Sequence, residues 1–594
     1  MWRPALLLGA ATAIVIYGGI LRLNVLSSRY GVVTHPAWAR VLTTAAPPIA
    51  HALEPAIYAW PPDPIPYVGG DPVNYLRFAR EMRSFYQAHV REPMFLAITR
   101  LFLWLLGGQD VAVSFASATM STLCVLATFL LGRRTFGNAV GLLAALGFAI
   151  DYDVVAWAPD GWRDDTFTFF VVLGAYAFVR LRQDPKPAQA ALAGVAAAAA
   201  CLTRITSITW ILPALLFVAV EERSSIRQRL RMSALVAGIA AALVAPYLIN
   251  CWRATGDPFM SINEHTVYYR HGEGIATFKE PMNAVTYVAR KLTRKPVFQL
   301  DTLLGGLFVY PLHNKWSGFD LWVQGLTTWL VGFAVVGLLL WAGHPHGRFL
   351  LLVTFSSLVP YAFTWNVAGG GEWRFTMHAY PFFLLACAYA IVCVARALFR
   401  LRQGIRLPEG WWRGRPAIAI TAAAALTMLG WLGYQALPYF VARESLSYGE
   451  GTSIAAGSRD AMFYMDGWSP WKREGAVTVR MMTGDRGTIR LPLPERRAYS
   501  LTLRADPVTS DAPDHVTLLL NGRLLYRFGL GWDPQRVGSY SVTVPPDLVH
   551  PGANELKLVA DEVVDAASAG ARLTWLPPST PVSLRVWQVR LNPM

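Results

Sequence analysis

Charged residues are scarce in this chain of 594 residues, in which 15% of the residues are charged and 54% are hydrophobic. A soluble protein of this length divides into several domains with ordinary polar surfaces. Here the apolar residues come in long blocks instead. Since about 20 apolar residues are needed to cross roughly 30 Å of hydrocarbon, the blocks indicate a protein with many membrane spans rather than a soluble one.

Cysteines are also few, and the five (Cys124, Cys201, Cys251, Cys387 and Cys393) all lie in or beside apolar blocks. Their positions form neither a disulfide framework nor a zinc-finger spacing. The formal net charge of +15 would favour nucleic-acid binding in a soluble protein. Because the basic residues gather in short loops between apolar blocks, they indicate cytoplasmic loops and contact with anionic membrane lipid. Membrane lipid is therefore an expected partner, and nucleic acid is not.

The apolar blocks predict about eleven spans, the first of them uncleaved. They are 4–22, 112–131, 138–152, 166–181, 188–203, 207–221, 233–250, 321–342, 349–366, 377–397 and 416–438. Arginine and lysine fall in alternate loops, so the positive-inside rule places the N-terminus in the cytoplasm. An odd number of spans then places the C-terminus outside. We expect a protein of the bacterial inner membrane with a periplasmic C-terminal domain.

The short apolar segment 94–106 decides this topology, because counting it as a span would invert every later loop. We interpret it as a helix that lies in the outer interface. The first outer loop, 23–111, then contains two helical stretches, 72–88 and 93–106, and a second outer loop covers 251–320.

The composition changes after Pro438, and from about residue 450 the chain shows short alternating strands with turn signals. Leu520-Asn521-Gly522-Arg523 is typical of a tight hairpin. The spacing predicts an antiparallel β-sandwich of jelly-roll type. We therefore expect two domains, a helical membrane domain over 1–440 and an extracytoplasmic β-sandwich over 450–594.

Polar groups that could carry chemistry share one side of the predicted membrane, at the outer ends of spans or in outer loops. They are Asp71 with Tyr75, Arg91 with Glu92, Asp164 with Asp165, Arg204, the group Glu372, Arg374 and His378, and the pair His265 and Tyr269. Each has a structural alternative. Asp71 before Pro72 suits a helix N-cap, the paired acids can cap a span, and an arginine at a span end can reach the interface. Loop histidines are most often simply exposed.

Together, an acid and several arginines at an outer interface suit one kind of reaction. A sugar on a polyprenyl phosphate has a good leaving group, so the departing phosphate needs cations rather than a general acid. Arginine offers a planar, permanently charged fork for that purpose. The acceptor hydroxyl needs a base, which a carboxylate can supply.

The order of these groups resembles the GT-C glycosyltransferases over most of residues 1–400. It combines an outer-loop acid, an interfacial helix, FLLGRRTFGNAVGLLAALGFA, a second acid site, LTRITS and EWRFTMHAYPFF. Among them it is most similar to the protein O-mannosyltransferases and the lipid A aminoarabinose transferase. Many of those relatives have Asp-Glu in the first loop, where this chain has Asp71-Pro72. The β-rich C-terminal part resembles carbohydrate-binding sandwiches on some bacterial membrane glycosyltransferases.

The resemblance implies roles for several residues. Asp71 matches the catalytic acid of the first outer loop, and Asp164 or Asp165 matches the acid of the second. Arg91-Glu92-Pro93 falls where relatives have a charged residue at the donor phosphate, and Arg204 and Arg374 match two further basic positions. Weaker substrate contacts are expected from the remaining residues: Tyr75, Glu92, His265, Tyr269, Glu372 and His378.

The predicted function is the inverting transfer of a monosaccharide from a polyprenyl-phosphate donor to an extracytoplasmic glycan, lipid or protein hydroxyl. No cofactor is firmly predicted. A divalent metal stays an unsupported alternative, because these relatives are thought not to need one, although more distant GT-C oligosaccharide transferases do. The alternatives are a lipid or sugar transporter, a non-catalytic sugar-binding scaffold, and a different lipid-linked transferase. A transporter is disfavoured because it would place charges at mid-span. A phosphoethanolamine transferase would need a metal cluster and a nucleophile.

Overall fold

The structure is a computed structural model in which two compact units are described separately. The described residues are 4–30, 71–220, 225–264, 266, 283–309, 323, 325–363, 373–403, 415–457, 459–474, 477–510, 513–531, 537–568, 573 and 575–594. The first unit comprises Met1–Arg290 and Thr302–Ala424, and the second comprises Lys291–Asp301 and Ala425–Met594.

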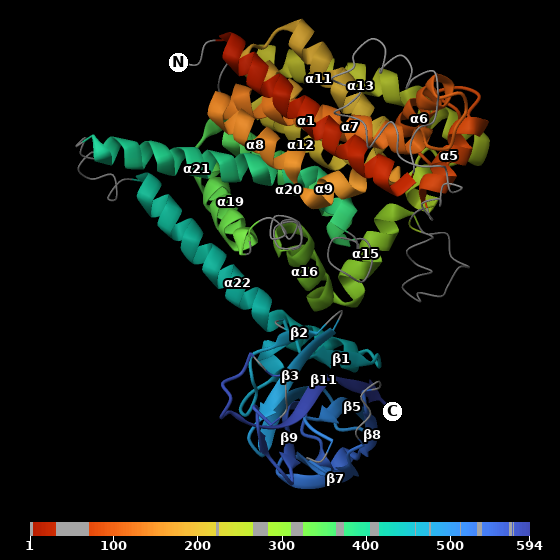
Figure 1. Cartoon of the computed structure of the whole chain (residues 1–594). Helices are drawn as coiled ribbons and strands as arrows, with labels where there is room; N and C mark the ends of the chain where they lie inside the picture. Colours follow the sequence, from red (N-terminus) through yellow and green to blue (C-terminus); the bar gives the residue numbers. More distant parts are fainter. Residues whose placement is uncertain are drawn as a thin grey trace. The chain divides into compact units, whose positions relative to one another are not determined.

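The first unit is a bundle of helices (Figure 1). Its long or apolar helices are α1 (Pro4–Tyr30), α6 (Pro93–Leu105), α7 (Ala112–Phe136), α8 (Asn138–Ile150), α10 (Asp164–Gln183), α11 (Pro187–Thr203), α12 (Ile208–Val220), α13 (Ile226–Thr255), α19 (Leu326–Ala342), α20 (Pro345–Phe363) and α21 (Tyr380–Arg402). The shorter elements are α5 (Asp71–Glu81), α9 (Tyr152–Trp157), η1 (Ala158–Asp160), η2 (Ile205–Ser207), η3 (Gly305–Val309) and η5 (Trp373–Ala379). The helices α15 (Ala284–Arg294), α16 (Pro296–Leu304) and α22 (Arg415–Ser447) have residues in both units.

Candidate membrane spans are confirmed, but their expected number is not. Every predicted span falls on a helix. By length and composition, however, four helices of the described chain can each cross a membrane, or up to six spans result if each of two bent pairs is one span. One bent pair turns by 54° after Ile150, and the other turns by 120° after Ala342. Together with the low charge of the chain, these helices identify an integral membrane protein.

The helices of the first unit pack closely where small residues face large ones. A Cβ atom added to Gly174 of α10 would lie 2.6 Å from the ring of Trp210 in α12, so only glycine allows this approach. The alanine-rich α11 likewise packs along α13, where Gly194 meets Ile239. Such contacts let helix backbones come close in the absence of a strong hydrophobic driving force.

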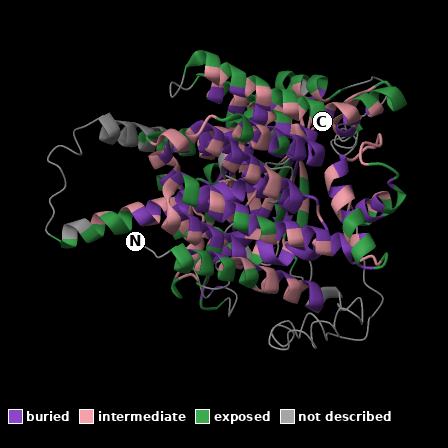
Figure 2. Ribbon diagram, turned by 90° about the horizontal axis from the view of Figure 1, so that it is seen from above, coloured by how far each residue is buried: buried purple, intermediate pink, exposed green. Residues whose placement is uncertain are grey.

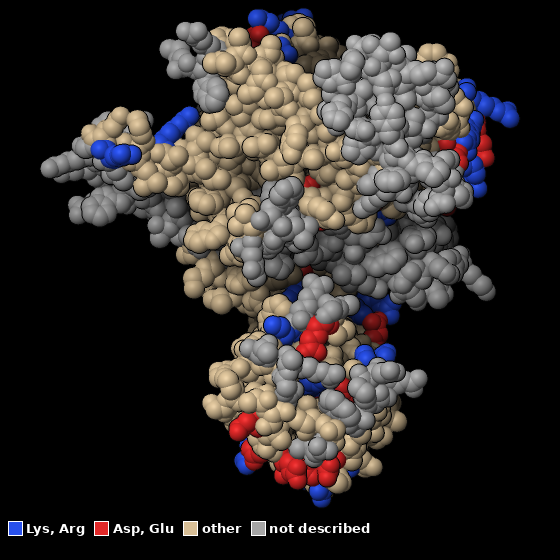
Figure 3. Space-filling model, in the orientation of Figure 1, with Lys and Arg blue, Asp and Glu red and all other residues tan. Residues whose placement is uncertain are grey.

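Buried residues fill the interior of this bundle (Figure 2). On the face drawn in Figure 3, most of the described atoms of the first unit belong to residues other than Lys, Arg, Asp and Glu. A surface with few charged side chains suits contact with lipid, where charges are costly.

The second unit carries two antiparallel sheets (Figure 1). One sheet contains β1 (Thr452–Ala455), β2 (Lys472–Glu474), β3 (Val477–Thr483), β5 (Tyr499–Pro507), β8 (Ser539–Val544), β10 (Val564–Asp565) and β11 (Pro581–Pro593), with the path β2-β3-β11-β5-β8. The other contains β4 (Arg486–Leu493), β6 (His515–Leu520), β7 (Arg523–Gly529) and β9 (Gly552–Ala560), in the order β4-β9-β6-β7. Alternate residues of both sheets form one hydrophobic core. The β-rich C-terminal region is thus confirmed, and the jelly-roll description stays a prediction.

The predicted hairpin connects β6 and β7. Asn521 and Gly522 both have positive φ values, 51° and 82°. A turn with two consecutive positive φ values has a backbone twist that matches the right-handed twist of the flanking strands. The local sequence therefore predicted this turn correctly.

Candidate active site

The first part of the candidate site comes from the start of α5. Asp71 is its first residue, and Tyr75 follows one turn later, where its hydroxyl donates a hydrogen bond to Asp71 Oδ2 at 3.4 Å. The Tyr75 ring is buried edge-on against Phe95 of α6, 5.4 Å between ring centres. Tyr75 is thus a fixed donor to the carboxylate that the sequence suggested as the base.

A glycine lets this helix start approach the second acid motif. Gly161 follows η1 with φ +79°, and a Cβ atom there would lie 3.3 Å from Pro72 and 3.1 Å from Val113. Because an L side chain at this φ is strained, Gly161 permits the close contact between the two motifs. The result is that Asp71 and Asp164 both come within 4 Å of Arg374.

The helix α5 ends at Glu81, whereas the sequence predicted a helix that continues to residue 88. The segment between α5 and α6 is therefore not helical. Two side chains of α13 hold it: the Tyr247 hydroxyl donates to the His89 carbonyl at 2.8 Å, and the Asn250 amide donates to the Tyr86 carbonyl at 2.8 Å. These bonds satisfy backbone groups that a continued helix would satisfy itself.

His89 in turn fixes the backbone of Arg91. The Arg91 backbone N–H donates to His89 Nδ1 at 3.0 Å, which requires that nitrogen to be unprotonated. Burial lowers the pKa of His89 below its ordinary value, which favours the neutral ring. The Arg91 guanidinium then donates from Nη2 to Asp71 Oδ1 at 3.3 Å.

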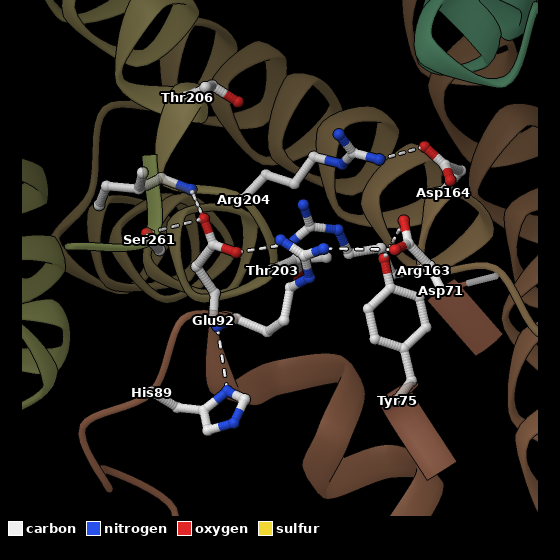
Figure 4. A network of polar contacts seen from close by, with 12 residues as sticks. Asp71, Tyr75, His89, Glu92, Arg163, Asp164, Thr203, Arg204, Thr206 and Ser261 are labelled. Atoms are coloured by element: carbon white, nitrogen blue, oxygen red, sulfur yellow. Dashed lines mark hydrogen bonds and ion pairs between the residues drawn. The ribbon is translucent and has the colours of Figure 1, made fainter. Parts of the chain in front are cut away.

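Glu92 is held by donors from three other parts of the chain. Its carboxylate accepts from Arg163 Nη1 at 2.5 Å, from the Ile205 backbone N–H at 2.9 Å and from the Ser261 hydroxyl at 3.3 Å (Figure 4). The side chain is buried. A substrate contact of Glu92 remains a prediction, and the geometry favours a positioning role beside Arg204.

The adjacent acids at the start of α10 point to different partners. Asp164 forms an ion pair with Arg204 and lies 3.8 Å from Arg374 Nη1. Asp165 instead hydrogen-bonds with Ser121 of α7, whose hydroxyl accepts from Arg22 Nε at 2.8 Å. Both acids are buried, but only Asp164 joins the arginine cluster that includes Asp71.

Arg204 and Arg374 are each enclosed by aromatic rings. Arg204 ends α11 in an extended conformation, with its guanidinium carbon 5.5 to 5.7 Å from the ring centres of Phe167, Tyr361 and Phe375. The Arg374 guanidinium carbon lies 3.6 Å from the Trp162 ring centre and 4.7 Å from that of Phe375. Stacked rings keep water away from the guanidinium planes and fix their orientation.

Arg374 also connects the two acid motifs. Its Nη1 lies 3.6 Å from Asp71 Oδ2 and 3.8 Å from Asp164 Oδ2. Figure 4 shows Tyr75 pointing to Asp71, and Arg204 reaching across to Asp164. Residues far apart in sequence, from α5 to η5, thus form one polar cluster within the first unit.

His378 lies beneath the aromatic rings rather than in the cluster. Its Nε2 is 3.1 Å from the Ser357 carbonyl, and its ring centre is 4.9 Å from that of Phe167 and 5.2 Å from that of Tyr361. It therefore supports the rings around Arg204. Three predicted contacts, His265, Tyr269 and Glu372, lie outside the described residues.

Three residues without an assigned role in the sequence interpretation have clear places in the structure. Arg163 binds Glu92, Trp162 stacks on Arg374, and Arg22 donates to Ser121 and to the carbonyls of Phe148 and Ala149 at the end of α8. A buried arginine inside the first apolar helix was a signal that could have pointed to this second network. Among the described residues, no group of three or more His, Cys, Asp or Glu is arranged to hold a metal ion.

Comparison with known families bears on the same segment of the chain. Residues 90–250 match the family model of the dolichyl-phosphate-mannose-protein mannosyltransferases. The matched segment contains Arg91, Glu92, Asp164, Asp165 and Arg204. The resemblance to the GT-C glycosyltransferases is thereby confirmed, over about a quarter of the chain.

Solved structures show distant likeness. The Archaeoglobus fulgidus oligosaccharyltransferase AglB, in complex with an inhibitory peptide and a dolichol-phosphate, is 12% identical with a TM-score of 0.41. That alignment covers 73% of this chain and 56% of AglB, so the chain spans about half the length of that protein. ArnT from Cupriavidus metallidurans, bound to undecaprenyl phosphate, is 14% identical with a TM-score of 0.38, covering 64% of this chain and 69% of ArnT.

The S. cerevisiae protein O-mannosyltransferase Pmt1-Pmt2 complex, bound to the sugar donor, is 15% identical with a TM-score of 0.29. It covers 42% of this chain and 34% of the matched yeast chain. Likeness at this distance assigns no donor, sugar or acceptor. A search of the curated proteins finds no match.

Proposed function

We propose that this protein is a membrane glycosyltransferase that moves a monosaccharide from a polyprenyl-phosphate carrier to an extracytoplasmic acceptor. The observation that supports this most is the single cluster in which Asp71 and Asp164 meet Arg91, Arg204 and Arg374. The family match over residues 90–250 includes part of that cluster. The acceptor is a hydroxyl of a glycan, a lipid or a protein.

The charge of the cluster suits a phosphate group. Four guanidinium groups face three carboxylates there, an excess of one positive charge over these seven side chains. Their members are Arg91, Arg163, Arg204, Arg374, Asp71, Glu92 and Asp164. As the sugar leaves, negative charge grows on the carrier phosphate, and preorganised guanidinium groups stabilise it most at that moment.

In the proposed reaction, the acceptor oxygen forms a bond to the anomeric carbon while the bond from that carbon to the phosphate oxygen breaks. The electron pair of the broken bond stays on the polyprenyl phosphate, which Arg91, Arg204 and Arg374 hold. The acceptor proton passes to the Asp71 carboxylate. Asp164 orients Arg374 and the acceptor. A single displacement of this kind inverts the anomeric configuration.

The places of these groups in the helices favour an interfacial enzyme over a transporter. Asp71 begins α5, Asp164 begins α10 and Arg204 ends α11, while Arg374 lies in η5 just before α21. A transport pathway would place ionisable residues at mid-span. Charges at helix ends instead meet the headgroup of a lipid carrier.

The proposal also includes location. We place the cluster on the outer side of a bacterial inner membrane, with a cytoplasmic N-terminus and a periplasmic β-rich unit. The domain limits 1–440 and 450–594 belong to the same proposal, as does a glycan-binding role for the β-rich unit.

The test uses the purified full chain in lipid nanodiscs with sugar-labelled donors. Polyprenyl-phosphate monosaccharides should be consumed with release of polyprenyl phosphate, and nucleotide sugars should not. The anomeric configuration of the product, read by NMR, should be opposite to that of the donor. Use of a nucleotide sugar instead, or retention of configuration, would contradict the proposal.

A further inference from the structure

The carboxylate proposed as the base is held by the cations proposed to hold the donor. Asp71 Oδ1 lies 3.3 Å from Arg91 Nη2, and Asp71 Oδ2 lies 3.6 Å from Arg374 Nη1. A carboxylate held between two guanidinium groups is a poor proton acceptor, because protonation would cost both ion pairs. While they face Asp71, the same two guanidinium groups also attract a phosphate less strongly, because the carboxylate partly neutralises their charge.

We propose that the donor phosphate displaces Asp71 from Arg91 and Arg374, so that donor binding itself frees the base for the acceptor. This inference rests on the proposed function and adds to it an order of events. The donor binds first, its phosphate takes over the two arginines, and Asp71 then becomes available to accept the acceptor proton. Asp71 and the phosphate thus compete for one pair of cations.

The geometry distinguishes this exchangeable carboxylate from the two fixed ones. The Asp71 side chain is 30% exposed, while those of Asp164 and Glu92 are 3% and 5% exposed. The ion pairs of Asp71, at 3.3 and 3.6 Å, are longer than the roughly 2.7–2.9 Å of a strong charge-assisted hydrogen bond. The Glu92 carboxylate, by contrast, accepts from Arg163, from the Ile205 backbone N–H and from the Ser261 hydroxyl.

Tyr75 keeps the released carboxylate in place. Its hydroxyl donates to the same Oδ2 that faces Arg374, and its ring is buried against Phe95. When Arg374 turns to a phosphate, Asp71 retains this neutral partner at the start of α5. A neutral donor leaves the carboxylate more basic than two cations do.

Competition predicts an unusual result: removal of the base should strengthen binding of the lipid phosphate. The test measures the Kd of radiolabelled polyprenyl phosphate, which carries no sugar, by scintillation proximity on the full chain in nanodiscs. Asp71→Asn should lower Kd by about fivefold or more, the usual lower range for coupled sites. Asp71→Ala should do the same, and it also removes capping ability at the start of α5.

A matched control separates competition from general attraction of an anion. Asp110→Asn changes the net charge by the same amount, but Asp110 pairs with Arg80 on an exposed surface outside the cluster. Its Kd should equal that of the parent. Unlabelled polyprenol should fail to displace the label from any of these proteins, and thermal unfolding should show that each variant is folded.

The outcomes are distinct. If the parent binds polyprenyl phosphate and both Asp71 variants bind it equally or more weakly, the exchange is wrong while the proposed function stands. Equal tightening by Asp110→Asn, or displacement by polyprenol, would also overturn the exchange. If the parent itself does not bind polyprenyl phosphate, the proposed function fails, and the exchange fails with it.

Discussion

Arg374 offers the most informative substitution, because it contacts two of the three carboxylates of the cluster, Asp71 and Asp164, and yet neither depends on it alone. In Arg374→Ala, Asp71 retains Arg91, and Asp164 retains Arg204. The change therefore leaves no carboxylate of the cluster without a cation. We expect a folded protein with a weakened phosphate site.

The magnitudes of the two effects differ. Loss of the Trp162 stack should reduce stability by about 0.5–2 kcal/mol, the range for a cation–π contact. Loss of a preorganised positive charge that stabilises the transition state should lower turnover by about 10²–10³-fold, or roughly 3–4 kcal/mol. Arg374→Lys should fall between parent and Ala, because it keeps the charge and loses the planar fork.

Arg459→Ala provides a matched control in the other unit. Arg459 also stacks on an aromatic ring, Tyr434 at 4.0 Å, and pairs with a carboxylate, Asp301. Its removal should cause a comparable loss of stability with turnover unchanged. The assay measures donor consumption and thermal unfolding for all the variants. Turnover of Arg374→Ala within a few-fold of the parent would refute the assignment of Arg374 to the donor phosphate.

Three further predictions concern the surroundings of the cluster. Asp165→Asn should lower the unfolding temperature but reduce turnover far less than Asp164→Asn does, since only Asp164 joins the arginines; equal turnover losses would contradict this. The pKa of His89 is lowered in the folded state. The contribution of His89 to the free energy of unfolding should therefore be complete above its ordinary pKa of about 6.5, and it should decrease as the pH drops below that value. His89→Gln should flatten this part of a plot of unfolding temperature against pH, and an unchanged slope would count against it. In intact cells, a cysteine at Ile226 should be shielded from an impermeant thiol reagent and one at Ser510 should react; labelling at Ile226 would overturn the predicted topology.

Elements with strong local signals were predictable from the sequence. The Asn521-Gly522 hairpin follows from two residues that tolerate positive φ, and both adopt it. Pro93 is predicted to begin the second helix of the outer loop, and α6 starts there. The β-rich end was recognisable because alternating residues repeat along each strand.

Features that depend on tertiary contacts were less predictable. The helix 72–88 was expected to be longer than α5, because its sequence does not reveal the bonds from Tyr247 and Asn250 that hold the segment after Glu81. The number of spans was hard to predict from the sequence for a related reason. Hydropathy does not separate a short apolar helix within the bundle, such as α11, from a helix that crosses the bilayer.

The candidate site shows the same division. The sequence suggested Asp71, Asp164, Arg204 and Arg374 from residue type and order, and the structure brings these four together. The sequence alone did not distinguish the role of Asp164 from that of Asp165, because adjacent residues at a helix start differ only in the direction in which their side chains point.

The rate of sugar transfer in Asp71→Asn tests whether Asp71 accepts the acceptor proton. Asn is nearly as good a residue at a helix start as Asp, so the variant should fold, with an unfolding temperature lowered only by the loss of the charged partner of Arg91 and Arg374. We expect a loss of transfer of about 10²–10⁴-fold, the usual contribution of a general base, while Asp110→Asn transfers as the parent does. A folded Asp71→Asn that transfers sugar within a few-fold of the parent rate would show that Asp71 is not the base.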